Sequence, residues 1–258
     1  PEERSGGAAA FRIEPDGSLT ALNQQVTHGA APCYVSTDRS GRLLFAANYH
    51  SGTLTVFPIL PDGALAPACQ VVQHQGRSVV SPNQDSAHAH SILPDPANRF
   101  VLAADLGMDQ VRVYRLDAAA GQLALQSAAH ASPGAGPRHI VFHPGGRWVY
   151  VSNELNSTVT AFTWEAEIGQ LAEINTLSTL PARAPASPPN AVADLHLTPD
   201  GRFLYVSNRG HNSLARFAVD ASSGALTFLG CTSSGGNWPR GFAISPDGRW
   251  LVCAHQYS

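Results

Sequence analysis

Four polar residues have side chains suited to binding a small anion or to moving a proton: His90, Arg138, Glu154 and Arg240. A carboxylate such as that of Glu154, or an imidazole such as that of His90, can take a proton from water as a general base. A guanidinium group presents a planar fork of N–H donors that suits phosphate, carboxylate or a developing oxyanion. These four residues are therefore the first candidates for a functional site.

Each candidate lies at a fixed distance from one of five arginines that close similar sequence segments. The position nine residues before these arginines holds Cys33, His90, Arg138, Ala193 and Arg240, and the position seven residues after them holds Tyr49, Leu106, Glu154, Arg209 and Gln256. Repeats that served structure alone would reuse one residue type at such positions. Arginine, histidine and glutamate occur there in only some copies, which is typical of a site.

A structural role is the alternative for each candidate. Arg138 or Arg240 could hydrogen-bond carbonyl groups of an adjacent loop, and His90 could simply line a channel. Glu154 could pair with an arginine, for which Arg138 in its own repeat is the nearest choice. The sequence leaves both roles open for these residues.

Further substrate contacts are predicted from His88, Asn153 and Arg209. His88 and His90 have the spacing of two ligands on one strand face, but no third ligand is evident nearby, so we expect no metal. Asparagine recurs at one position of the repeat, in Asn48, Asn153 and Asn208. Such a repeated asparagine also fits a turn-forming residue at a strand end.

Several catalytic templates are absent from the sequence. All 16 Lys+Arg residues are arginine, which excludes Schiff-base chemistry, a P-loop lysine and a Ser-Lys dyad. Neither a Gly-x-Ser-x-Gly elbow nor a Gly-x-Gly-x-x-Gly in a βαβ context is present. The four cysteines are far apart and form no Cys-x-x-Cys, so we expect free, largely buried thiols rather than a zinc site.

The elements that position the candidates repeat along the chain. The five arginines, called blade arginines below, are Arg42, Arg99, Arg147, Arg202 and Arg249, and they are 57, 48, 55 and 47 residues apart. A polar residue follows each of them six positions later, and in four copies a Gly-x-Leu begins 21 or 22 positions after the arginine. This agreement indicates an internal repeat. Because the blade arginines recur beside a turn in every copy, we expect them to be structural.

Each repeat reads as four short strands, which in one copy begin near residues 139, 147, 158 and 169. Four antiparallel strands repeated every 47 to 57 residues predict an all-β fold, a β-propeller of four-stranded blades, rather than a β-sandwich. We place one propeller domain over residues 1–258, with complete blades near 32–85, 86–134, 135–188 and 189–236 and half-blades at 6–26 and 239–258. The half-blades could close a five-bladed ring, but we expect a piece of a longer propeller.

Composition restricts the class of partner. Hydrophobic residues make up 43% of the 258 residues and charged residues 14%, as in a globular protein. The net charge of −3 and the lack of a basic run argue against a nucleic-acid partner or an anionic membrane surface. No stretch reaches the roughly 18 to 20 apolar residues of a membrane span. With no visible signal peptide, we expect a cytoplasmic location.

Several long stretches carry a family resemblance, among them AlaHisAlaHisSer (87–91), GlyProArgHisIleValPheHisPro (136–144), SerAsnGluLeu (152–155) and GlyGlyAsnTrpProArgGlyPhe (235–242). They resemble the lactonase family of seven-bladed propellers, which includes bacterial 6-phosphogluconolactonases and fungal carboxy-muconate lactonizing enzymes. The resemblance runs over nearly the whole chain and departs mainly by truncation. It implies a cleft on one propeller face. The family's histidine, arginine, glutamate and second arginine fall on His90, Arg138, Glu154 and Arg240.

The resemblance implies a sugar-lactone hydrolase of the pentose phosphate pathway, with the small molecule 6-phosphogluconolactone as substrate and no metal or organic cofactor. Glu154 is the expected general base, with His90 as the competing assignment. Arg138 and Arg240 would hold the phosphate and the oxyanion, in an order that stays open. The alternatives are another lactone hydrolase, a muconate-type lactonizing enzyme, and a propeller that serves as a non-catalytic binding scaffold.

Overall fold

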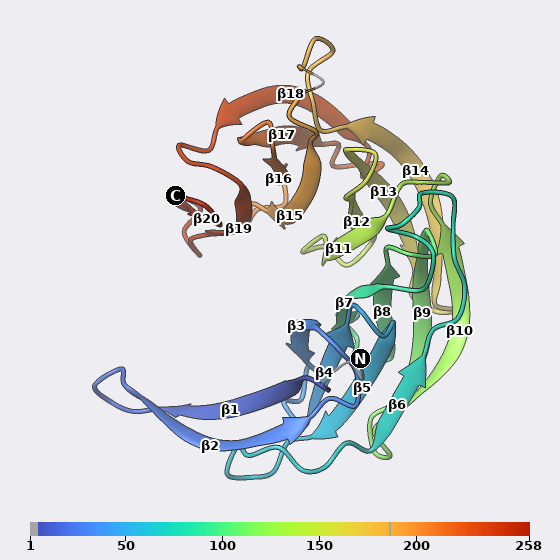
Figure 1. Cartoon of the computed structure of the whole chain (residues 1–258), viewed down its shortest axis with the longest axis vertical. Helices are drawn as coiled ribbons and strands as arrows, with labels where there is room; N and C mark the ends of the chain where they lie inside the picture. Colours follow the sequence, from blue (N-terminus) through green and yellow to red (C-terminus); the bar gives the residue numbers. More distant parts are fainter. Residues whose placement is uncertain (1–4, 186) are drawn as a thin grey trace. The chain divides into compact units, whose positions relative to one another are not determined.

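The structure, a computed structural model, describes residues 5–185 and 187–258. These residues form twenty β-strands and no helix (Figure 1). No helix in this part of the chain is therefore long and apolar enough to cross a membrane. Contacts within the chain divide it into two compact units, residues 1–127 and 128–258, and β10 ends just past the division.

The first unit holds one hairpin and two four-stranded antiparallel sheets. The hairpin pairs β1 (Gly7–Ile13) with β2 (Leu19–Val26). The first sheet runs in the order β3 (Pro32–Thr37), β4 (Leu43–Asn48), β5 (Thr53–Pro58) and β6 (Gln70–Gln73). The second runs in the order β7 (Ala89–Pro94), β8 (Phe100–Asp105), β9 (Gln110–Asp117) and β10 (Gln122–His130).

The second unit repeats this arrangement with two sheets and a hairpin. One sheet contains β11 (Pro137–Phe142), β12 (Trp148–Asn153), β13 (Thr158–Glu165) and β14 (Gln170–Ser178). The next contains β15 (Ala191–Leu197), β16 (Phe203–Arg209), β17 (Ser213–Val219) and β18 (Leu226–Ser233). The hairpin pairs β19 (Pro239–Ile244) with β20 (Leu251–His255). The predicted four-stranded antiparallel blades, four complete and two half, are confirmed in the described residues.

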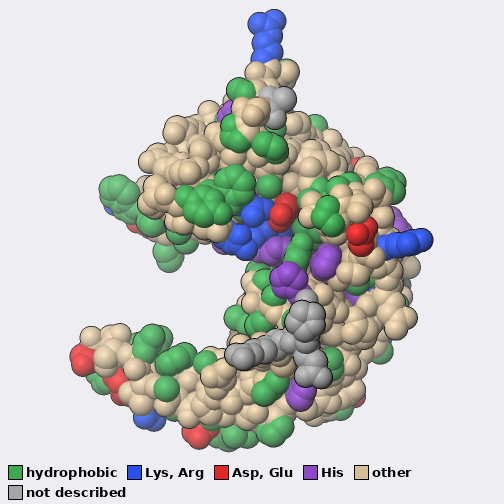
Figure 2. All heavy atoms as spheres, in the orientation of Figure 1, with side chains coloured by type: hydrophobic (Ala, Val, Ile, Leu, Met, Phe, Trp, Pro, Cys, Tyr) green, Lys and Arg blue, Asp and Glu red, His purple; other side chains and the backbone are tan. Residues whose placement is uncertain are grey.

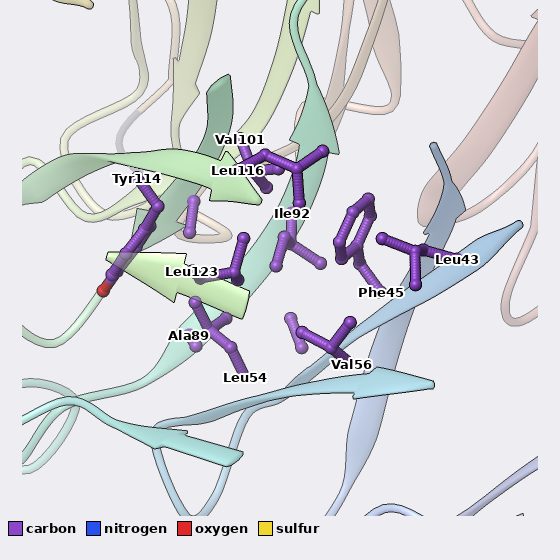
Figure 3. Close-up of a cluster of buried hydrophobic side chains, with 12 residues drawn as sticks. Leu43, Phe45, Leu54, Val56, Ala89, Ile92, Val101, Tyr114, Leu116 and Leu123 are labelled. Carbon is purple, nitrogen blue, oxygen red and sulfur yellow. The ribbon is translucent and has the colours of Figure 1, made fainter. Parts of the chain in front are cut away.

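The core of each unit lies between its sheets. In the first unit, Phe45 and Leu54 from one sheet meet Ile92 and Val101 from the other (Figure 3). The second strands β8 and β12 are buried at every position, as expected of strands covered on both faces. Gly121 and Gly169 end the turns before the fourth strands β10 and β14 with φ of 65° and 64°, a conformation that favours glycine.

The blade arginines have the structural role predicted for them where the contacts show it. The Cζ atom of Arg147 lies 4.5 Å from the ring centroid of Trp148, and that of Arg202 lies 5.6 Å from the ring of Phe203. The backbone N–H of Arg42 donates to Asp38 Oδ1 at 2.7 Å within the preceding turn. Arg147 and Arg202 thus pack on aromatic rings at the start of a second strand, and Arg42 is bonded within the turn before one.

The prediction for the cysteines is half right. Among the described residues no disulfide joins any of the four cysteines, as predicted. The predicted burial is wrong, because Cys33 is exposed and Cys69, Cys231 and Cys253 are only partly buried.

Candidate functional site

A β-bulge interrupts the first strand of each of the four blades and of the C-terminal half-blade. The regular pairing breaks after Pro32, Ala89, Pro137, Val192 and Pro239. The residues that follow these breaks are the ones at the position nine before each blade arginine, namely Cys33, His90, Arg138, Ala193 and Arg240. A bulge re-aims side chains and often lies beside a functional site. The local backbone therefore supports the position that the sequence singled out.

In the second unit, Glu154 joins two arginines from adjacent blades. Its Oε2 atom lies 2.9 Å from Arg138 Nε and 2.9 Å from Arg209 Nη2. The Arg138 and Arg209 side chains are only 3% and 6% exposed, so these are buried ion pairs. The backbone fixes Glu154 as well, because its N–H donates to the Gly136 carbonyl at 2.7 Å and its carbonyl accepts from Val192 N–H at 3.2 Å.

Arg138 is the most informative member of this group. Its Nε–H donates to Glu154, and one Nη1–H donates to His139 Nε2 at 3.0 Å. The other three of its five N–H groups have no hydrogen-bond partner among residues 5–185 and 187–258. A buried guanidinium with three N–H groups unused within the protein can bind an anion or a developing oxyanion.

The electrostatic environment of Arg138 is strongly perturbed. Burial lowers the pKa of Arg138 to about 10; the attraction of Glu154 opposes this, and repulsion from Arg209 and Arg240 adds to it. The residue still carries its charge at neutral pH. Figure 2 shows arginine side chains gathered beside an acidic one over β15 and β19.

Two histidines and an aspartate adjoin the arginine cluster. His139 Nδ1 lies 2.9 Å from Asp194 Oδ1, and His196 Nε2 lies 3.1 Å from Asp194 Oδ2. Burial would raise the pKa of Asp194, but hydrogen bonds from His139 and His196 hold it well below its usual range. His139 and Asp194 follow the predicted positions Arg138 and Ala193 by one residue, and the sequence reasoning missed them.

The other predicted residues of this unit are placed less favourably for a shared site. Arg240 is exposed, and its Nη1 donates to Gln256 Oε1 at 3.2 Å. Arg209 donates Nε–H and Nη2–H to the carbonyls of Ala191 and Val192 at 3.3 and 2.9 Å, which gives it a structural role beside its ion pair.

Asn153 is buried and hydrogen-bonded within its own blade. It is 1% exposed, and its Nδ2 donates to Thr158 Oγ1 and Thr160 Oγ1 at 2.9 Å each. Asn48 makes the corresponding bonds to Thr53 and Thr55. The repeated asparagine therefore ties the second strand of a blade to the third, and the contact of Asn153 with substrate stays a prediction.

In the first unit, His88 directly precedes β7 and His90 is the second residue of that strand. His88 stacks on Tyr49 with ring centroids 4.6 Å apart, and its Nδ1 lies 2.9 Å from the Tyr49 carbonyl oxygen. His90 is 5% exposed, meets the Tyr49 ring edge to face at 5.3 Å, and has Nδ1 3.8 Å from Cys33 Sγ. The two predicted histidines are thus brought together with Tyr49 and Cys33.

A buried Asp-His-Tyr chain supports this histidine segment. Asp105 Oδ1 accepts the backbone N–H of His88 at 2.8 Å, and its Oδ2 lies 2.6 Å from His74 Nδ1. The Tyr114 hydroxyl lies 2.7 Å from His74 Nε2. Sequence reasoning missed this chain, because His74 lies outside the strands of the repeat in which the candidates were sought.

In the described part of the chain, no three His, Cys, Asp or Glu side chains are grouped so that they could hold a metal ion. The second unit gathers guanidinium, carboxylate and imidazole groups. These can bind an anion, stabilise a developing oxyanion and accept a proton.

Known proteins are similar to this chain over nearly its whole length. Residues 1–258 match the family described as "Lactonase, 7-bladed beta-propeller". The chain is 38% identical over 253 residues to the 6-phosphogluconolactonase of Bacillus subtilis, covering 97% of this chain and 71% of that protein. It is 35% identical over 260 residues to the 6-phosphogluconolactonase of Formosa agariphila, covering 98% and 72%. The solved structure of a periplasmic gluconolactonase of Pseudomonas aeruginosa superimposes with a TM-score of 0.90 at 38% identity, covering 99% of this chain and 72% of that one.

Proposed function

The chain belongs to the seven-bladed β-propeller lactonase family, and from this premise we propose that it hydrolyses a sugar lactone, with 6-phosphogluconolactone as the substrate. The names of two relatives, each at least 35% identical over nearly the whole chain, support this reaction and this substrate. The similar gluconolactonase structure supports lactone hydrolysis, although its printed name carries no phosphate.

The proposal rests on the burial and the hydrogen bonding of Arg138. A guanidinium that is 3% exposed and has three N–H groups without a protein partner in the described residues is suited to an anionic ligand. The charges that act on Arg138 are those of two arginines, Arg209 and Arg240, and of two carboxylates, Glu154 and Asp194; burial keeps His139 neutral. The group therefore carries one excess positive charge, which favours an anionic substrate.

Lactone hydrolysis needs a base for the attacking water and a donor for the oxyanion that forms at the carbonyl. We assign the oxyanion or the phosphate to the spare N–H groups of Arg138, and the remaining anionic group to Arg240, which is exposed. Water attacks the lactone carbonyl carbon while its proton passes to the base. The ring C–O bond then breaks, and the ring oxygen takes up a proton to become a hydroxyl group.

Glu154 is the proposed base, since a carboxylate positioned beside the reacting water can accept its proton. Its two arginine partners on Oε2 compete with a proton for that oxygen. His90 therefore stays the alternative base, and His88 an alternative contact to substrate. Arg209 is proposed to hold Glu154 in place rather than to touch substrate.

The test is the hydrolysis rate of freshly prepared 6-phosphogluconolactone, measured with the full-length protein after subtraction of the spontaneous rate. Glu154→Gln and Arg138→Ala should each lower kcat/KM by about 100-fold or more if they take these roles. Glucono-lactone without phosphate, run in parallel, reports whether the phosphate is recognised. A folded protein that accelerates neither lactone would contradict the proposal.

The cellular location is a separate proposal. We propose the cytoplasm, where sugar phosphates are found, if phosphorylated lactone is the better substrate. A preference for the unphosphorylated lactone would instead favour the location named for the similar gluconolactonase, the periplasm. Fractionation of the source cells with an antibody against the protein distinguishes the two.

A further inference from the structure

We propose that His139 and Asp194 are positioning residues for Arg138: Asp194 fixes the imidazole of His139, and the imidazole in turn fixes the guanidinium. The proposal rests on the proposed function, in which Arg138 binds the substrate. Neither His139 nor Asp194 belongs to the residues that the sequence predicted. Both lie at β-bulges, in β11 and β15, which are neighbouring first strands of the second unit.

The contacts form a continuous chain from β15 to the guanidinium. Asp194 Oδ1 lies 2.9 Å from His139 Nδ1, and His139 Nε2 lies 3.0 Å from Arg138 Nη1. Arg138 Nε continues the chain to Glu154 Oε2 at 2.9 Å. The guanidinium is therefore held at two of its nitrogen atoms, one by a carboxylate and the other by an imidazole.

The proton positions in this chain follow from the partners. A guanidinium has only donors, so His139 Nε2 must accept the hydrogen bond from Arg138. The proton of the neutral ring then lies on Nδ1 and is donated to Asp194. A charged imidazolium would direct a second N–H at the guanidinium, so the chain requires a neutral His139.

The surroundings of His139 keep it neutral. Its side chain is 15% exposed, and burial, with the charge of Arg138 as the second cause, lowers its pKa to about 4 even though Asp194 opposes the shift. The ring is therefore neutral throughout the physiological range. This agrees with the acceptor role that the distances require.

Asp194 is itself anchored in the inner strands. Its Oδ1 accepts the N–H of Leu195 at 3.0 Å, and its Oδ2 accepts the N–H of Phe242 in β19 at 3.3 Å. Its own N–H donates to Ser207 Oγ at 2.9 Å, and the N–H of His139 donates to Ser152 Oγ at 3.1 Å. These bonds give the backbone N–H groups at the two bulges their hydrogen-bond partners. They also fix the backbone that carries the His139 and Asp194 side chains.

An Asp-His pair often activates water or a nucleophile in hydrolases, but here the geometry assigns it another task. In a base, Nε2 would face water or substrate. In this protein Nε2 accepts from Arg138, and its low pKa makes the ring a weak base. Positioning of Arg138 is therefore the role that fits, and it matters because a displacement of about 1 Å at a binding group can cost about 100-fold in rate.

The chain supplies a matched control for the test. His196 binds the other oxygen of the same Asp194 carboxylate but has no contact with Arg138 among the described residues, and its side chain is 39% exposed. We expect His139→Ala to lower kcat/KM for 6-phosphogluconolactone by about 10- to 100-fold, and His196→Ala to stay within about twofold. His139→Gln should recover most of the loss, because its carboxamide oxygen can accept from the guanidinium. Equal effects of the two alanine variants, or no rescue by glutamine, would overturn the proposal.

Two further measurements keep the result interpretable. Thermal melting of each variant establishes that it is folded at the assay temperature, and if His139→Ala unfolds, the comparison is made between His139→Gln and Asp194→Asn. Asp194→Asn can donate to Nδ1 and so favours the wrong tautomer; it should lose activity at least as strongly as His139→Ala. An Asp194→Asn variant as active as the wild type would contradict the positioning role.

A binding measurement tests the positioning role independently of the proposed function. If the wild-type protein accelerates no lactone, that function is wrong, and the positioning role is read from calorimetric titration with 6-phosphogluconate as the anionic probe. Binding that weakens at least about tenfold in His139→Ala and stays unchanged in His196→Ala supports positioning. Binding that is the same in all three proteins, or absent from the wild type, overturns it.

Discussion

The neutral state of His139 makes the stability of the second unit depend on pH. Burial, together with the nearby charge of Arg138, lowers its pKa from 6.5 to about 4 in the folded protein. In the unfolded chain the imidazole titrates near its ordinary value of about 6.5. At pH values between about 4 and 6.5, the imidazole is therefore protonated in the unfolded chain and unprotonated in the folded protein.

The sign and the size of the effect follow from this difference. A folded-state pKa below the unfolded one gives stability that is fully present above pH 6.5 and is lost as the pH falls toward 4. At about 1.4 kcal/mol for each pH unit, the lowering amounts to roughly 3 kcal/mol, all from one side chain. His139→Gln has no titrating group at this position, so the free-energy difference between wild type and variant must shrink by up to that amount.

The assay is urea unfolding of wild type and His139→Gln, followed by tryptophan fluorescence at half-unit steps between pH 7 and pH 4. The quantity of interest is the difference in the free energy of unfolding at each pH, so a constant cost of the substitution cancels. His196→Gln serves as the control, because its ring is more exposed and does not contact Arg138. A wild-type minus His139→Gln difference that stays constant over this range would refute a buried, neutral His139.

Three further outcomes are expected. Glu154→Gln leaves two buried guanidinium groups without their carboxylate and should cost about 3 kcal/mol, seen as a melting temperature several degrees below that of the exposed control Glu165→Gln. Arg138→Lys should lower kcat/KM at least about 100-fold, with calorimetry showing whether ligand affinity falls too, because an ammonium group cannot reproduce the fork. Tyr114→Phe removes the donor to buried His74 and should cost about 1 to 3 kcal/mol in urea unfolding, with kcat/KM unchanged.

The sequence predicts the blades well because their determinants are local and repeated. Apolar second strands such as 148–153, turn residues before the blade arginines, and glycines before the fourth strands recur in register. A side chain at one position of a repeat is placed by the same backbone in each copy. Comparing copies therefore isolated Arg138, Glu154 and Arg209, which the structure brings within ion-pair distance.

His139 and Asp194, the residues of the arginine cluster that the sequence missed, were overlooked for the same physical reason. Alternation along a strand places neighbours such as Arg138 and His139 on opposite faces, so a search at one position ignores the next. The bulge breaks that alternation and lets both side chains enter one cluster. In the following blade the searched position holds Ala193, and Asp194 beside it carries the chemistry. Bulges are formed by pairing across strands, which single-sequence patterns do not encode.

The absence of lysine from the chain fits the chemistry of this cluster. Burial and neighbouring charges lower the pKa of Arg138 from 12.5 to about 10, yet the group stays charged at neutral pH. The same lowering applied to a lysine, whose ordinary pKa is about 10.4, would bring its pKa to about 8. Part of the lysine population would then be uncharged near neutral pH and would bind an anion less well. A lysine also has a single nitrogen, whereas Arg138 donates to Glu154 and His139 from two and keeps three N–H groups for a ligand. A site that buries its anion-binding group this deeply therefore selects arginine.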